Sequence, residues 1–383
     1  MTRPMSLVPT RADAISRAAN IDANRYARTR NYLNGDVTRL SPHITHGLTN
    51  IPELLQNIQA RSAISWDDKI VFEFGWREYF QHVWERLGVD IWRTPHQPPA
   101  SAAAYADALP DDIRGATTGV AIIDQQIREL YRVGYLHNHA RMWIASYVVH
   151  IRKVSWQVGA RWMYAHLLDG DLASNTLSWQ WVAGTWTGKP YLFNAENVAR
   201  YAPNVDCSGS VIDTSYEMLD VMARSNKPPL SPQRSLIEPT PEPPVFAAPP
   251  SPPTEVAQHN PAAAVWLMHP WSLHLPDDRA AVGVINTDFH AAYPWSAQRW
   301  QWVMAAMHAR CASVMIGSSD ELVAMLARTQ LTAIKTLNPH YDVLLRRVAA
   351  TILPVPRAFG NPNMLKRSFT SFWNQVSREP FPR

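Results

Sequence analysis

The chain has 383 residues, of which 46% are apolar and 18% charged, with 36 Lys and Arg against 32 Asp and Glu. At about 150 residues per domain, this length predicts two or three domains. No run approaches the roughly 20 apolar residues of a membrane helix, and Cys207 and Cys311 are too few for a disulfide framework or a four-cysteine metal site. The composition therefore favours a soluble, cytoplasmic protein that binds neither a membrane nor a metal.

The first part of the chain is predicted to be helical. Apolar residues recur at three- and four-residue spacing from Ile51 to Leu87 and again from Ile122 to Leu168. Turns are expected at Asn34–Asp36, Thr118–Gly119 and Asp169–Asp171, because Gly and Asp tolerate tight backbone geometry.

The second part alternates between strands and helices after a proline-rich stretch, Pro228–Pro253. Proline pairs fix an extended backbone, so this stretch is expected to be an exposed linker. The predicted strands are Val265–His269, Ala281–Ile285, Ala312–Gly317 and Leu331–Leu337, and the predicted helices are Ser296–Arg310, Ser319–Arg328 and Tyr341–Ala350. This order is typical of a Rossmann-like parallel sheet covered by helices. We expect a helical domain over residues 1–226, a linker over 227–256 and an α/β domain over 257–383.

Polar clusters interrupt the helical part, and each allows a structural reading. Thr38–Ser41 precedes a helix start and suits either phosphate binding or capping. Glu73–Glu78 suits either a binding surface or a salt-bridged helix. Arg141 lies in an apolar context and needs an acidic partner, for which Asp169 and Asp171 are candidates. His137 and His139 lack the spacing of metal ligands, which favours packed core histidines.

Taken together, these clusters resemble a known family. Their order and spacing are similar to the FAD-binding helical domain of the DNA photolyase/cryptochrome family, in the segments Tyr26, Thr38–Pro42, Glu73–Glu78, His137–Met142, Asp169–Asn175 and Trp179–Trp181. Val265–Leu267 and Ser368–Trp373 resemble the start and end of the family's α/β domain, which ordinarily precedes the helical one. The resemblance therefore implies a circularly permuted photolyase, with the helical domain first.

The resemblance implies non-covalent FAD, and it leaves an antenna pigment open. Arg141 and Asp169 match an ion pair beside the flavin ring, Asp171 matches a second carboxylate there, and Asn175 matches the Asn facing flavin N5. Val37 stands where the family has a hydroxyl in its phosphate turn. The implied cofactor-binding residues are Tyr26, Thr38, Arg39, Leu40, Ser41, Asn138, Arg141, Asp169, Asp171 and Asn175.

The implied partner is DNA that contains cyclobutane pyrimidine dimers, bound by a monomer. The implied substrate-binding residues are Glu73, Trp76, Arg77, Asn138, His139, Met142 and Trp181. Asn138 and Met142 stand where enzymes that repair (6-4) photoproducts carry His, which disfavours that substrate. His139 departs from the Arg usual in dimer-splitting enzymes.

The implied catalytic residues are Glu73, Asn175, Trp179 and Trp156, with the two tryptophans passing electrons to the flavin. The family's third tryptophan would fall near Asp112 or Ile113, and neither is aromatic. Trp162 and Trp186 are candidate replacements. A light-driven repair lyase is the favoured function; a cryptochrome-like photoreceptor without repair activity and a flavin-free remnant are the alternatives.

Overall fold

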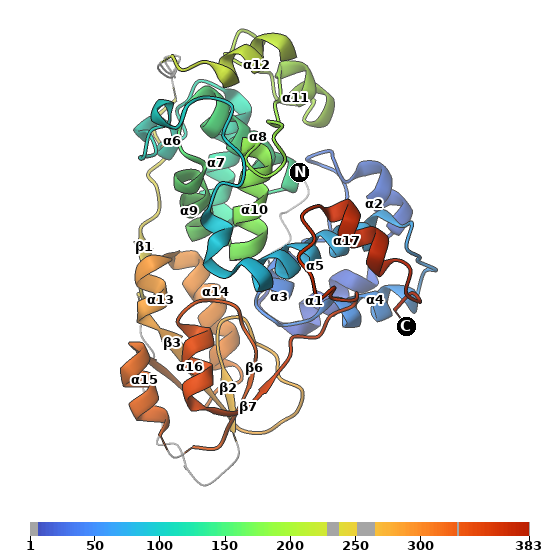
Figure 1. Ribbon diagram of the computed structural model, residues 1–383, viewed down its shortest axis with the longest axis vertical. Coiled ribbons are helices and arrows are strands. Elements are labelled where there is room, and N and C mark those ends of the chain that lie inside the picture. The colour runs from blue at the N-terminus through green and yellow to red at the C-terminus, as the bar shows by residue number, and fades with distance from the viewer. Residues whose placement is uncertain (1–6, 228–236, 251–264, 328, 383) are drawn as a thin grey trace. The chain divides into compact units, whose positions relative to one another are not determined.

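A computed structural model describes residues 7–227, 237–250, 265–327 and 329–382. It divides the chain into two compact units, labelled by element in Figure 1. Unit 1 comprises Met1–Ala23, Thr38–Arg86 and Pro244–Arg383, and unit 2 comprises Asn24–Val37 and Leu87–Pro243. These boundaries differ from the predicted domains, because early helices of the chain share their contacts with its last third.

Unit 2 is helical, as the apolar period predicts. Its elements are α2 (Ala23–Thr29), η1 (Gly88–Trp92), η2 (Ala102–Ala104), α6 (Asp111–Arg114), α7 (Ala121–Val133), α8 (Asn138–Ser146), the π-helical turn η3 (Tyr147–Ile151), α9 (Trp156–His166), α10 (Leu172–Ala183), α11 (Ala195–Tyr201) and α12 (Tyr216–Arg224). Gly134 ends α7 at φ 65°, a left-handed conformation that glycine adopts without strain. The chain can therefore turn directly into α8. The core of this unit is built on residues such as Ile123, Ile127, Trp143 and Trp179.

Unit 1 joins helices to a sheet. Its elements are α1 (Arg11–Ala19), α3 (Ser41–Thr45), α4 (Ile51–Gln59), α5 (Lys69–Leu87), β1 (Val245–Phe246), β2 (Val265–Met268), β3 (Ala281–Asn286), α13 (Thr287–Ala292), β4 (Trp295–Ser296), α14 (Ala297–His308), β5 (Ser313–Gly317), α15 (Ser319–Leu326), β6 (Leu331–Ile334), α16 (Tyr341–Val348), β7 (Ala349–Leu353) and α17 (Phe369–Val376).

Five strands form a parallel sheet in the order β5-β3-β2-β6-β7. Every residue of β2 and β3 is buried, as expected for central strands covered on both faces. The sheet confirms the predicted combination of a helical and a Rossmann-like α/β architecture. Ser318 caps α15 in a capping box with Glu321, which explains why β5 gives way to a helix at this point.

The described part of the predicted linker makes specific contacts. In unit 2, the Thr240 amide donates to the Gly115 carbonyl at 2.8 Å, and the Glu242 carboxylate pairs with His166 at 2.9 Å. In unit 1, β1 pairs with β4. Most of the described residues 237–250 are nonetheless exposed, so these contacts hold an exposed segment against each unit; 228–236 and 251–256 lie outside the described residues.

Candidate functional site

The residues singled out in the sequence fall in both units. Thr38, Arg39, Leu40, Ser41, Glu73, Trp76 and Arg77 belong to unit 1, and the others, from Tyr26 to Trp181, belong to unit 2. The site is therefore described unit by unit.

Arg141 on α8 pairs with Asp169, one of the two acids expected from the sequence. The guanidinium donates to both carboxylate oxygens, at 2.7 and 3.0 Å, and its Nε donates to the Leu136 carbonyl at 3.0 Å. The Asp169 side chain is 3% exposed and that of Arg141 is 24% exposed. A charge as buried as Asp169 needs such a partner, because removal from water is costly. The exposed part of the guanidinium remains accessible to a ligand.

The start of α10 presents further polar groups. Asp171 caps the helix, because its carboxylate accepts from the Ser174 amide at 2.7 Å. The Asn175 side-chain amide donates to the Ala160 carbonyl of α9 at 2.8 Å, which fixes its orientation. The buried Ser174 hydroxyl has no hydrogen-bond partner among the described residues. A buried hydroxyl beside an oriented amide suits a polar ligand.

The first turn of α8 brings together two expected substrate residues. The Asn138 side-chain nitrogen lies 3.6 Å from the Met142 sulfur, one helical turn away. Asn138 is exposed and Met142 half-buried.

His139 packs between aromatic rings of unit 2. Its imidazole lies 5.4 Å from the Trp143 ring and 4.8 Å from the Tyr201 ring, centroid to centroid. Burial, together with the charge of Arg30, lowers the pKa of His139 to about 4. The side chain is therefore neutral near pH 7, unlike the Arg for which it stands.

Tryptophans of α9 and α10 lie close to one another. A Cβ on Gly159 would approach the Trp179 ring to 2.3 Å, so this glycine lets the ring lie directly against α9. Trp156 lies one turn before Gly159, and its indole stacks on Trp92 of η1, with ring centroids 5.9 Å apart and planes 7° apart. Trp92 is half-buried, and the Arg161 guanidinium lies 4.7 Å from its ring centroid.

Trp92 was not among the site residues predicted from the sequence. Trp92 lies 64 positions before Trp156 in the sequence, and the two rings meet because η1 packs against α9 in the fold. In the sequence, its position just after a long predicted helix was the feature that could have pointed to it. Trp162 and Trp186 were the residues expected to replace the family's third tryptophan. Trp162 donates to the Tyr131 hydroxyl at 3.1 Å, and Trp186 is half-buried. At the position where the family has its third tryptophan, Asp112 pairs with Arg152 and Ile113 is fully buried.

In unit 1, the predicted phosphate turn precedes α3. Arg39 adopts φ 51°, an uncommon conformation for a residue with a side chain. The Leu40 amide donates to the Thr38 hydroxyl at 3.3 Å, and Leu40 is buried. Tyr26 lies on α2 in unit 2 and is half-buried.

Helix α5 carries Glu73, Trp76 and Arg77, all half-buried. Arg77 donates to the Thr45 hydroxyl at the end of α3. The Trp76 ring stacks on Phe369 of α17, with centroids 4.0 Å apart and planes 9° apart. One face of the expected substrate-binding tryptophan is thus covered by the chain's own last helix.

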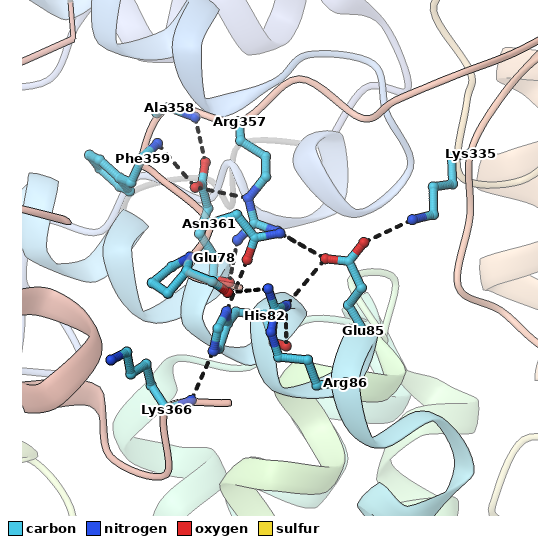
Figure 2. Close-up of polar contacts among 11 residues, drawn as sticks. Glu78, His82, Glu85, Arg86, Lys335, Arg357, Ala358, Phe359, Asn361 and Lys366 are labelled. Carbon is cyan, nitrogen blue, oxygen red and sulfur yellow. Dashed lines mark hydrogen bonds and ion pairs between the residues drawn. The ribbon is translucent and has the colours of Figure 1, made fainter. Parts of the chain in front are cut away.

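A polar network occupies the next turns of α5 (Figure 2). The Glu78 carboxylate accepts from the amides of Ala358 and Phe359 at 2.7 and 3.1 Å and pairs with Arg357. Burial raises the pKa of Glu78 to about 6 against the opposing effect of Arg357.

His82 has a defined tautomer in this network. Its Nε2 accepts from the Lys366 amide at 3.0 Å, so the proton lies on Nδ1, which donates to the Asn361 side-chain oxygen at 2.9 Å. Burial lowers the pKa of His82 to about 4. The neutral imidazole is therefore the form that makes both bonds.

Within the described residues, no group of three or more His, Cys, Asp or Glu could hold a metal ion. No described helix is long and apolar enough to cross a membrane.

Comparison with known proteins gives a family match. Residues 70–224 match the model of the FAD-binding domain of DNA photolyase. This range contains the Arg141–Asp169 pair, Asn138, Asn175 and the tryptophan cluster.

Curated relatives agree with this match. Deoxyribodipyrimidine photo-lyase of Streptomyces griseus is 35% identical over 159 residues, which is 40% of this chain and 34% of the relative. Cryptochrome DASH of Ostreococcus tauri is 30% identical over 196 residues, which is 49% of this chain and 35% of the relative. The chain thus matches about a third of the length of each relative. The crystal structure of the archaeal photolyase from Sulfolobus tokodaii aligns with a TM-score of 0.45 at 21% identity, over 58% of this chain and 52% of that one.

Proposed function

The chain belongs to the DNA photolyase/cryptochrome family through the FAD-binding domain at residues 70–224, and we propose that it is a light-driven lyase that splits cyclobutane pyrimidine dimers in DNA. Its cofactor is FAD. The activity and the substrate are the proposal; they rest on this chain's own residues.

The groups in unit 2 suit a flavin. Arg141 offers a part-exposed guanidinium whose charge is balanced by Asp169, and α10 offers the oriented amide of Asn175 beside the unpaired Ser174 hydroxyl. These donors match the polar edge of a flavin ring. We assign Arg141, Asp169, Asp171, Asn175 and Asn138 to the ring. Tyr26 and the turn from Thr38 to Ser41 are assigned to the diphosphate, since a turn before a helix exposes backbone amides to phosphate.

Arg141, Asp171 and Asn175 would hold FAD, which in its reduced form and under blue light would supply the electron that opens the cyclobutane ring and take it back afterwards. The protein's part is to take the dimer out of the DNA stack and hold it. Trp76 and Trp181 provide aromatic faces for the dimer, and Asn138 and Met142 contact its edge. In its protonated form, Glu73 donates a hydrogen bond to a pyrimidine carbonyl, where negative charge builds up during cleavage.

Trp179, Trp156 and Trp92 are assigned to electron supply. Buried Trp179 and Trp156 lie on adjoining helices, and the stacked, half-buried Trp92 extends them to a side chain that solvent can reach. Trp92 therefore takes the outer place that Asp112 and Ile113 cannot fill.

The observation that supports this function most is the composition of α8. One helix joins the flavin-type pair Arg141–Asp169 to the Asn138–Met142 contact expected of dimer-splitting enzymes. The experiment is repair by Glu73→Ala. Repair per absorbed photon should fall while FAD content stays at the wild-type level; unchanged repair would contradict the role of Glu73.

A cryptochrome-like photoreceptor is the second candidate. Cryptochrome DASH is among the relatives, and neither Asp112 nor Ile113 is aromatic. Such a protein would bind FAD and respond to light without removing dimers.

A further inference from the structure

The segment after β7 is bound to α5 along several turns of that helix. We call residues 354–376 the C-terminal strap; it ends in α17, which lies beside α5 in Figure 1. Its first half is held by the network of Figure 2, in which Glu78 binds Ala358 and Phe359 and His82 binds Asn361 and Lys366.

Arg86 and Glu85 extend these anchors. Arg86 donates to the Pro362 carbonyl, and Glu85 accepts from Asn361 and Lys335 at 2.8 Å each. The bond from the Phe359 amide to Glu78 is buried, and those to Ala358, Lys366 and Pro362 are part-buried, so breaking them would cost free energy. The strap is therefore built as a fixed part of unit 1.

The second half of the strap is held by aromatic packing. A Cβ on Gly75 would approach the Trp373 ring to 2.2 Å, so α17 comes as close to α5 as a glycine permits. The rings of Phe72 and Phe369 meet edge to face with their centroids 4.7 Å apart, and Phe369 is 5% exposed. These contacts fix the plane of the Phe369 ring.

Phe369 in turn fixes the ring of Trp76. The two rings are parallel at 4.0 Å, whereas Tyr79 and Phe80 meet Trp76 at steeper angles, with centroids 5.7 and 5.5 Å away. Trp76 keeps part of its surface exposed. Phe369 thus covers one face of the indole and sets the orientation of the remaining surface.

We propose that Phe369 is a positioning residue for DNA binding: it holds Trp76 in the plane that a flipped pyrimidine dimer stacks against, and it restricts the dimer to the face opposite the strap. The inference rests on the proposed function. A ring that is already ordered loses less conformational freedom when it binds. An aromatic pair of this kind corresponds to about a 2- to 12-fold change in an equilibrium constant.

The test is the dissociation constant for a single-stranded oligonucleotide with one cyclobutane thymine dimer, measured in the dark by fluorescence anisotropy on the FAD-bound protein. Phe369→Leu should weaken binding several-fold. Phe369→Tyr should bind like the wild type, because it keeps an aromatic ring against Trp76. Repair per absorbed photon at saturating DNA should stay unchanged in both. Should F369L fail to fold, Phe369→Met takes its place, since Met fills irregular space.

Phe372→Leu is the matched control. Phe372 lies on the same helix and is fully buried, but the rings of α5 that it contacts are Tyr79 and His82. It should lower the melting temperature and leave the dissociation constant unchanged. Equal weakening by F372L would overturn the inference, because the effect would then be general loosening of α17.

A further test combines F369L with Trp76→Ala in one protein and measures the same dissociation constant. If Phe369 acts through Trp76, F369L should not weaken DNA binding further when Trp76 is already Ala. Additional weakening in the double variant would contradict the inference. A wild-type protein that binds dimer-containing and undamaged oligonucleotides equally would instead refute the proposed function. Wild-type discrimination combined with normal binding by F369L would refute the role of Phe369 alone.

Discussion

Asp169 is nearly fully buried, and Arg141 balances its charge. Arg141→Ala should release FAD and destabilise the fold by about 3–5 kcal/mol, because it removes the ion pair of a buried carboxylate. Absorption spectra of the purified proteins measure flavin content, and urea unfolding measures stability. Arg132→Ala, which removes an exposed ion pair with Glu129, is the control and should change neither. Full flavin content in R141A would contradict the assignment.

Trp92 is the residue whose role depends most on the fold. Trp92→Phe should slow photoreduction of oxidised FAD to a rate near that of Trp156→Phe, because the phenyl ring is much harder to oxidise than indole and cannot relay the electron. Chemically reduced protein should repair dimers normally in both, since electron supply and repair are separate steps. Time-resolved absorption under blue light checks the first point. Trp162→Phe is the control; if it slows photoreduction and W92F does not, the electron leaves by another route.

Contacts between single residues could be predicted from the sequence where the two residues are close along the chain or carry opposite charges. Arg141 with Asp169 could be predicted because a buried charge needs an opposite charge. Trp92 with Trp156 could not, because no local rule links a 3₁₀ turn to a helix more than 60 residues later. The stack of Trp76 on Phe369 was hidden for the same reason.

Helix α5 carries a buried acid that should make the stability of the protein depend on pH. The pKa of Glu78 is about 6 in the folded protein against 4.5 for an unperturbed Glu. The folded state therefore binds this proton more tightly than the unfolded chain. Its stabilising effect is fully present below pH 4.5 and is lost as the pH rises through 6.

Glu78→Gln has no such proton and isolates the effect. Relative to E78Q, the wild-type protein should gain about 2 kcal/mol of unfolding free energy between pH 7 and pH 4.5. His82, whose pKa is lowered, acts in the opposite direction but is present in both proteins. Urea unfolding at the two pH values measures the difference. A wild-type protein that loses stability relative to E78Q on acidification would contradict the assignment of the proton to Glu78.

The elements themselves were largely predictable. The four predicted strands became β2, β3, β5 and β6, and helices such as α14 and α15 lie within one or two residues of the predicted ends on most sides. Strand β7 was missed, because Ala349–Leu353 follows α16 without a turn residue and its start was absorbed into the predicted helix. The two-residue strands β1 and β4 carry no local signal of their own.

For the whole molecule, the sharing of contacts between early and late segments has a consequence for truncation. In unit 1, His46 after α3 binds the Pro270 carbonyl at 2.6 Å, and α5 binds the C-terminal strap. A fragment of residues 1–226, the predicted helical domain, would lose these contacts, because Pro270 and the C-terminal strap lie in the missing part. It should be poorly soluble or show a broad thermal transition, and co-expression with residues 227–383 should restore a cooperative one. An isolated fragment that melts like the full chain would support the predicted boundaries instead.

Dimer repair by this protein can be measured directly. Protein with fully reduced FAD is mixed with single- and double-stranded oligonucleotides that carry one cyclobutane thymine dimer, and the remaining dimer is quantified after blue light and after darkness. We expect the dimer to be lost in light alone, and an oligonucleotide that carries a (6-4) photoproduct to be left unchanged. No light-dependent loss from either form of DNA would contradict the lyase function and leave the photoreceptor as the function of this chain.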